Sequence, residues 1–146
     1  MSGLDDLYRE LILDHSRDPQ GKGDPQAEAH SHHELNPSCG DEITMGATVD
    51  EDGAIASLHW EGQGCSISMA SASVMSDLLA GASRDEALAR IDEFREMLRS
   101  RGSVEPSERL EDAAAFQGVA KYVMRIKCAM LGWVALEACL MESAAT

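Results

Sequence analysis

The sequence contains few aromatic residues, few basic residues and no long apolar run, and each shortage limits the structure or the partners of the protein. Aromatic side chains make up only 4% of the 146 residues, so a buried core has to be built from aliphatic residues and the eight methionines. No run of 18 apolar residues occurs, which excludes a membrane-spanning helix. Four cysteines in a chain of this length do not make a disulfide-rich secreted module.

Basic residues are outnumbered by 26 acidic residues to 12, which gives a formal net charge of −14. Such a surface repels nucleic acids and anionic membranes, so we expect neither as a partner. Its expected partners are basic protein surfaces or metal ions, unless the acidity only keeps the chain soluble. No basic, apolar leader opens the sequence, because Asp5, Asp6 and Arg9 interrupt it. We therefore expect a cytoplasmic protein with reduced thiols.

The length fits one domain over residues 1–146, and its first half predicts a small antiparallel sheet. Ile43–Val49 and Ala54–Trp60 have the pattern of strands, joined by a hairpin turn at 50–53 that ends in glycine. The polar, weakly alternating stretch from Ala27 to Leu35 predicts at best an edge strand.

Helical periodicity surrounds these strands. It predicts about five helices. Four of them cover Leu4 to about His15, Ser66–Leu79, Leu110 to about Val123, and Cys128–Met141. The remaining helix begins at a capping box formed by Ser83 and Glu86 and runs to Leu98. The expected fold class is therefore α+β, a three-stranded antiparallel sheet packed with helices.

Three cysteines stand in stretches unlike ordinary core sequence: Cys39 in P-S-C-G-D, Cys65 in G-Q-G-C-S-I-S-M and Cys128 in R-I-K-C-A-M. Cys65 precedes one predicted helix and Cys128 opens another, and a helix start favours a thiolate. Cys39 and Asp41 flank Gly40 before a strand, where residues two apart face the same way. Three sulfurs and one oxygen suit tetrahedral zinc, or an iron–sulfur cluster with one ligand that is not cysteine. Spacing alone is weak support, because no C-x-x-C pair is present.

The sequences of these stretches are similar to those of the iron–sulfur scaffold family of IscU and NifU, and more closely to those of its SufU branch. The matching motifs are N-P-S-C-G-D, G-Q-G-C-S-I-S-M-A-S-A-S, R-I-K-C-A-M-L-G-W and the opening L-Y-R-E-L-I-L-D-H-S-R-D-P, which together cover nearly the whole chain. The resemblance implies that the metal ligands are Cys39, Asp41, Cys65 and Cys128.

Two features resemble the SufU branch more than IscU. Lys127 stands where IscU-type proteins usually carry a histidine before the last cysteine. The branch also has an insert before the last cysteine motif, and residues 84–118 are long enough to contain it, with the loop Arg101–Arg109 as the expected added piece. Arg125 matches a branch arginine near the metal, where a cation could stabilise a departing or persulfurated thiolate.

The resemblance implies a zinc-dependent sulfurtransferase of the SUF pathway. Such a protein takes persulfide sulfur from a SufS-type cysteine desulfurase, activates that enzyme, and passes the sulfur to downstream SUF assembly proteins. We expect Cys39 to be the acceptor, because Gly40 frees its loop while Cys65 and Cys128 are anchored to helices. Asp41, one hard oxygen among sulfurs, would leave room for ligand exchange.

Two other functions remain open. One is a scaffold on which an iron–sulfur cluster is assembled and transferred to apo-proteins. The other is a structural zinc domain that serves for docking. In each case we expect the chain to be a monomer on its own.

The histidines offer a second metal hypothesis. In a strand, His30 and His32 would share a face while His33 points away, but a polar edge strand or exposed loop is the favoured interpretation. His15 and His59 are expected to be structural or at the surface.

Cys139 lies in an apolar helical pattern and is predicted to be a core cysteine. The methionines are predicted to pack in the core, with part of the set as an alternative partner interface; they are Met69, Met75, Met124, Met130 and Met141.

Overall fold

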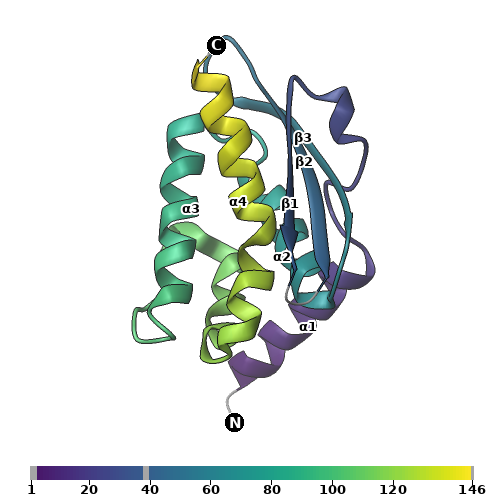
Figure 1. The fold of residues 1–146 in the computed structure, drawn as a ribbon. Coiled ribbons are helices and arrows are strands. Elements are labelled where there is room, and N and C mark those ends of the chain that lie inside the picture. Colours follow the sequence, from purple (N-terminus) through teal and green to yellow (C-terminus); the bar gives the residue numbers. More distant parts are fainter. Residues whose placement is uncertain (1–2, 38–39, 146) are drawn as a thin grey trace.

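The computed structural model describes residues 3–37 and 40–145, and its strands form the predicted antiparallel sheet (Figure 1). The order is β1-β2-β3, with β1 at His30–Asn36, β2 at Asp41–Val49 and β3 at Ile55–Gln63. β1 pairs with β2 so that Asn36 lies opposite Asp41. The central strand β2 therefore begins beside the end of the edge strand β1.

The connection between β2 and β3 is the turn predicted at 50–53. The Asp50 carboxylate oxygen Oδ1 accepts hydrogen bonds from the backbone N–H groups of Asp52 at 2.9 Å and Ala54 at 3.0 Å. Gly53 has a φ of +83°, which glycine adopts without steric cost. The hairpin prediction is confirmed.

The predicted start of the edge strand at Ala27 is wrong. Pro25–Ala27 forms a one-turn 3-10 helix, η1, in which the Asp24 carboxylate accepts the Gln26 N–H at 2.9 Å. Proline supplies the φ of a first helical turn and has no N–H to give to a strand. The strand begins only at His30.

Four α-helices occur in the described residues: α1 at Gly3–Arg17, α2 at Ser66–Leu79, α3 at Arg84–Arg99 and α4 at Val123–Ala145. The Ser83 hydroxyl caps α3 by accepting the Glu86 N–H at 3.1 Å, as the capping box predicts. The Glu86 carboxylate accepts the Arg90 Nε–H at 3.0 Å. None of the described helices is long and apolar enough to cross a membrane.

The helix predicted from Leu110 to about Val123 is present as a 3-10 helix, η2, over Glu108–Lys121, with a break at Glu111. Four of its buried apolar residues recur every third position, which matches the three residues per turn of a 3-10 helix; they are Leu110, Ala113, Phe116 and Val119. Ala114, Ala115 and Ala120 are buried as well. Over so short a stretch, the spacing of apolar residues in the sequence does not distinguish a 3-10 helix, with 3.0 residues per turn, from an α-helix, with 3.6.

The predicted start of the last helix at Cys128 is also wrong, because α4 begins at Val123. Tyr122 has extended dihedral angles and separates η2 from α4. Its carbonyl accepts the N–H groups of Arg125 at 2.8 Å and Ile126 at 3.3 Å, which starts the new helix. Cys128 therefore lies in the second turn of α4.

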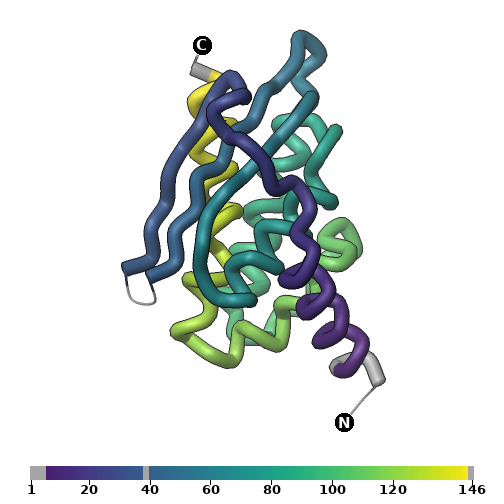
Figure 2. Tube along the Cα trace, turned by 90° about the vertical axis from the view of Figure 1, so that its right-hand side faces the viewer, coloured from purple at the N-terminus to yellow at the C-terminus, as the bar shows by residue number. Residues whose placement is uncertain are grey.

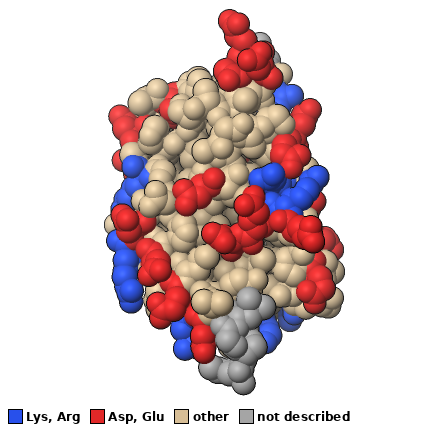
Figure 3. Space-filling model, turned by 180° about the vertical axis from the view of Figure 1, so that it is seen from behind, with Lys and Arg blue, Asp and Glu red and all other residues tan. Residues whose placement is uncertain are grey.

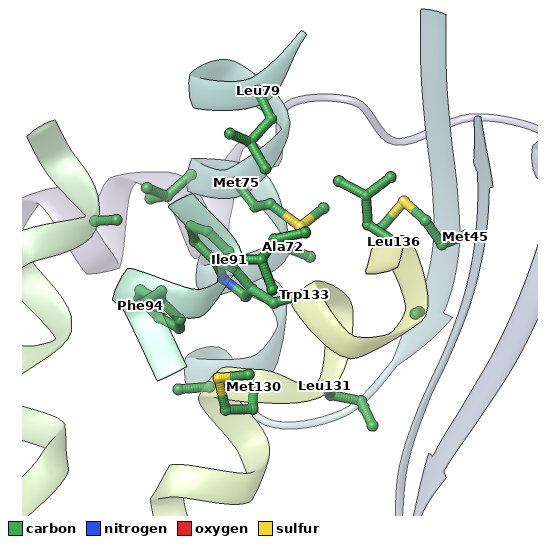
Figure 4. Packing of buried hydrophobic residues seen from close by; sticks show 14 of the residues in the cluster. Met45, Ala72, Met75, Leu79, Ile91, Phe94, Met130, Leu131, Trp133 and Leu136 are labelled. Carbon is green, nitrogen blue, oxygen red and sulfur yellow. The ribbon is translucent and has the colours of Figure 1, made fainter. Parts of the chain in front are cut away.

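α4 packs against β1 and β2, while α2 lies between α4 and α1 (Figures 1 and 2). Gly132 of α4 faces α2 so closely that an added Cβ would lie 3.1 Å from the Ala72 Cβ. Next to it, the Trp133 indole stacks on the Phe94 ring with centroids 3.9 Å apart (Figure 4). The indole N–H donates to the Ser71 hydroxyl at 2.9 Å. The core thus joins α2, α3 and α4.

The methionine prediction is confirmed in part. Met75 and Met130 are buried, and Met69 packs against the core cluster. Met124 and Met141 are 66% and 58% exposed, so the core prediction is wrong for these two. Both lie near the ends of α4.

The Phe94–Trp133 stack predicts a large effect of truncating Phe94. Phe94→Ala leaves a cavity in the core and should lower the free energy of unfolding by about 3–5 kcal/mol, measured by urea denaturation. Leu7→Ala, at a position 68% exposed, should change it by less than about 0.5 kcal/mol. Equal effects of the two changes would contradict this packing.

Candidate metal site

Three side chains with metal-ligating atoms meet at one end of the sheet. Asp41 is the first residue of β2, Cys65 directly precedes α2, and Cys128 lies in the second turn of α4. One ligand atom from each lies within 4.8 Å of the others. Asp41 and Cys128 are buried and Cys65 is half-buried. The fold brings together three of the four predicted ligands.

Cys39, the fourth predicted ligand and expected acceptor, lies outside the described residues. Gly40, which follows it, has a φ of +71°. The Gly40 N–H donates to the Asn36 carbonyl at 2.9 Å. Asp41 is then set at the start of β2, two positions along the chain from Cys39.

The Asp41 carboxylate is held by both of its oxygens at the start of α2. Oδ1 accepts the Cys65 backbone N–H at 2.9 Å. Oδ2 accepts the Ser68 hydroxyl at 2.5 Å and lies 3.5 Å from the Cys65 thiol. A helix start favours negative charge, which agrees with the prediction that Cys65 precedes a helix. Asp41, Cys65 and Ser68 form one hydrogen-bonded unit.

Gly64 makes this unit possible. A Cβ at this position would lie 2.5 Å from Asp41 Oδ1 and 2.8 Å from its Cγ, closer than atoms can approach. Only glycine therefore lets the chain pass over the carboxylate. The sequence pattern did not single out Gly64 or Ser68 as site residues, although both stand in the stretch G-Q-G-C-S-I-S.

Cys128 is 1% exposed, and its sulfur is surrounded by polar groups from two segments. The Asn36 side-chain N–H₂ lies 3.9 Å from Sγ and donates to it. The Cys128 thiol points to the Met124 carbonyl, one turn back in α4, at 3.7 Å. Because α4 begins at Val123, the predicted stabilisation of Cys128 at a helix start is replaced by these contacts.

Arg125 is the positive group at the site, as its match to the branch arginine suggests. The pKa of its guanidinium is raised, first by a hydrogen bond to Cys128 and then by charge attraction to Cys65 and Cys128. The side chain is exposed, so it places a cation at the mouth of the site beside both sulfurs.

The three clustered histidines lie in the edge strand β1, as the favoured interpretation predicts. Each has its own contact: His32 Nε2 with Glu34 at 2.7 Å, His33 Nδ1 with Thr44 Oγ1 at 2.9 Å, and His30 Nδ1 with Glu142 at 3.8 Å. Within residues 3–37 and 40–145, the one group of three metal-ligating side chains close enough to share an ion is Asp41, Cys65 and Cys128.

The other two histidines have structural contacts, as predicted. His15 Nδ1 lies 2.6 Å from the Ser73 hydroxyl and ties α1 to α2. His59 Nδ1 lies 3.4 Å from the carboxylate of Glu28, which is itself buried. Neither contact reaches the metal site.

Cys139 is a core cysteine, as predicted. It is 1% exposed, and its thiol donates to the Met45 carbonyl at 3.3 Å. Burial raises the pKa of the Cys139 thiol to about 12, with the Glu142 carboxylate as a second cause. At neutral pH this thiol is protonated and is not a nucleophile.

Two thiols and a carboxylate, clustered at the end of a small antiparallel sheet, define a class of domain that binds soft metal ions or handles sulfur. The comparisons narrow this class. The model for the NifU-like N terminal domain matches residues 7–139, and the chain belongs to this family.

The relatives carry two kinds of name. The iron–sulfur cluster assembly scaffold protein IscU of Streptococcus pyogenes is 40% identical over 99% of this chain and 89% of its own length. The zinc-dependent sulfurtransferase SufU of Bacillus subtilis is also 40% identical, over 93% of this chain and 90% of its own. Family membership is therefore shown, while the names divide between a scaffold and a sulfurtransferase.

Solved structures confirm the predicted α+β fold. A putative iron–sulfur cluster assembly scaffold protein for the SUF system from Fervidobacterium islandicum matches with a TM-score of 0.81 and 32% identity, over 90% of this chain and 94% of that one. The N-terminal NifU-like protein from Brucella abortus matches with a TM-score of 0.83 and 27% identity, over 99% of each chain.

The close approach of Gly64 to Asp41 yields a prediction for metal binding. Gly64→Ala displaces the carboxylate and should weaken zinc binding at least about 10-fold, measured by competition with a chromogenic chelator. Gly118→Ala is the control, because its added Cβ meets no atom within 4 Å. Unchanged zinc affinity of folded Gly64→Ala would show that Asp41 does not bind the ion.

The raised pKa of Cys139 yields a prediction for alkaline stability. Above about pH 8.5 the unfolded chain loses this proton while the folded chain keeps it, up to a pKa of about 12. The unfolded state then binds fewer protons, so the contribution of Cys139 to stability falls as pH rises. The difference in unfolding free energy between wild type and Cys139→Ala should shrink from pH 8 to pH 11 in urea titrations. A constant difference would contradict the burial of this thiol.

Proposed function

We propose that this chain is a zinc-dependent sulfur acceptor in iron–sulfur cluster assembly, served by a SufS-type cysteine desulfurase. The observation that carries the proposal is the cluster of Asp41, Cys65 and Cys128, whose ligand atoms lie within 4.8 Å of one another. The 40% identity to a protein named zinc-dependent sulfurtransferase supports it.

The donor set fits zinc. Zinc–sulfur bonds of about 2.3 Å place the sulfurs of a tetrahedral site about 3.8 Å apart, so a separation of up to 4.8 Å needs only a small contraction. One carboxylate oxygen and two thiolates are suitable ligands for this ion, and Cys39 would supply the fourth. Bound zinc would hold the thiolates deprotonated and protect them from oxidation.

The proposed reaction is a transfer between thiols. The desulfurase presents a persulfide, and the Cys39 thiolate attacks its outer sulfur. A new sulfur–sulfur bond forms on Cys39 while the old one breaks, and the electron pair leaves on the desulfurase thiolate. No oxidant or reductant is consumed, and the sulfur then passes to downstream SUF assembly proteins.

The ligands would have unequal roles in this reaction. Cys65 and Asp41 are fixed to each other and to Ser68 by hydrogen bonds. Cys128 is buried in α4. These contacts favour Cys39 as the ligand that leaves the metal. Arg125, beside both described sulfurs, would stabilise negative charge when a ligand departs.

Two features support the SufU-like role over the scaffold role. Lys127 stands where the scaffold branch usually has histidine, and a lysine ammonium is a poor ligand at neutral pH. The SufU-type insert is expected within residues 84–118, a range that contains α3, the loop that follows it and most of η2. The scaffold function remains the second candidate, because relatives of this chain carry that name.

The proposal predicts stimulation of a cysteine desulfurase by this protein. Adding it to a SufS-type enzyme should raise turnover of cysteine several-fold, measured as alanine released. Cys39→Ser should abolish the stimulation while retaining most of its zinc, and Cys139→Ala, which removes a core thiol, should retain it. No stimulation by the wild-type protein would overturn the acceptor role. Protein purified without oxygen should be colourless with one zinc; a brown protein with iron and sulfide would support the scaffold function.

A further inference from the structure

A groove of about 1210 Å³ opens directly beside the metal site. Its walls come from five segments: α1, the start of α2, the loop after α3 at Gly102, η2 and the start of α4. Cys65 and Arg125, which belong to the site, also line the groove. Anything that occupies the groove therefore lies against the sulfur chemistry.

The charge of the groove is opposite to that of the chain. Its described lining includes the cations Arg9, Lys121 and Arg125 and no aspartate or glutamate. The whole chain has 26 acidic residues against 12 basic ones, and acidic side chains are spread over the face in Figure 3. A local cationic surface on such a chain selects for a negatively charged ligand.

Three consecutive apolar residues also line the groove, between Lys121 and Arg125 in the sequence. Tyr122 is 64%, Val123 50% and Met124 66% exposed, at the junction of η2 and α4. Neighbouring exposed apolar residues indicate a contact surface, and tyrosine, methionine and arginine are enriched at protein interfaces. The groove thus combines an apolar anchor site with positive charge.

We propose that this groove docks an acidic segment, carrying an apolar anchor side chain, of the cysteine desulfurase. The inference rests on the proposed function, since the occupant has to deliver a persulfide to the adjacent site. Carboxylates of the segment would meet Arg9 and Lys121, and its apolar side chain would pack on Tyr122 and Met124.

Other occupants fit the same surface less well. A symmetric contact with a second copy would place the cations of one groove against those of the other. A nucleic acid would be repelled by the net charge of −14 on the rest of the chain. An acidic protein segment satisfies both the cations and the apolar residues.

Matched pairs of variants test the groove. Arg9→Glu changes a groove cation, whereas Arg17→Glu makes the same charge change two turns further along α1, outside the groove. Met124→Ala removes an exposed groove methionine, whereas Met141→Ala removes one near the other end of α4. Within each pair, the two variants change the same type of residue in the same helix, with the same change in charge.

The measurements are the Kd for the desulfurase by calorimetry and the KM and kcat of its stimulation. Arg9→Glu and Met124→Ala should each raise Kd and KM about 5- to 10-fold with little change in kcat, because they act on docking. Arg17→Glu and Met141→Ala should stay within about 2-fold of wild type. Arg9→Glu should also weaken the dependence of Kd on salt, since it removes one attraction.

The outcomes separate this inference from the function on which it rests. If the wild-type protein stimulates the desulfurase but the two variants of each pair have equal Kd and KM values, docking in the groove is overturned and the acceptor role is left intact. If the wild-type protein binds the desulfurase without stimulating it, and the Kd differs within each pair as predicted, the docking groove is supported and the acceptor role is overturned. Absence of wild-type binding would overturn the groove. If the groove variants lose self-association instead, the surface belongs to a second copy and the inference is wrong.

Discussion

The double hydrogen bonding of the Asp41 carboxylate at the start of α2 is the constraint on which the site depends. It joins the first residue of the central strand to the first turn of a helix that follows the sheet in the chain. Burying a carboxylate is costly unless its oxygens find donors, and here the Cys65 N–H and the Ser68 hydroxyl supply them. Gly64 leaves the space that this arrangement needs. The same contacts therefore satisfy a buried charge and orient two candidate ligands.

α4 carries the third candidate ligand, Cys128, and its position follows from core packing. Gly132 lets α4 approach α2, and the stack of Trp133 on Phe94 fixes α4 against α3. Cys128 lies one turn before Gly132 on the same helix, so the packing that buries the tryptophan also places the thiol. In this chain, stability and site geometry are produced by the same contacts, and a core substitution near Trp133 would disturb both.

Local patterns in the sequence were sufficient for the sheet, the 50–53 turn, α2 and α3, because each has a periodic apolar face or a defined turn residue. They failed at Pro25–Ala27, where the Asp24 cap and Pro25 form a 3-10 turn, and at the start of α4, which begins at Val123, and they did not identify η2 as a 3-10 helix. The candidate ligands were identified through cysteine motifs shared with a family. Ser68 and Gly64 were missed because a serine in a helix and a glycine before it have many uses, and only the position of Asp41 in space reveals theirs.

Arg125 belongs to two surfaces at once, since it lines the groove and also contacts the sulfur atoms of the site. A carboxylate that docks in the groove would compete with those sulfurs for one guanidinium. Occupation of the groove would then withdraw positive charge from the Cys65 and Cys128 thiolates, the two sulfurs proposed to stay on the metal, while a sulfur donor is present. Because such coupling is reciprocal, a change in charge at the sulfurs would alter the affinity of the groove by the same factor. Recognition and reactivity would in this way share a single side chain.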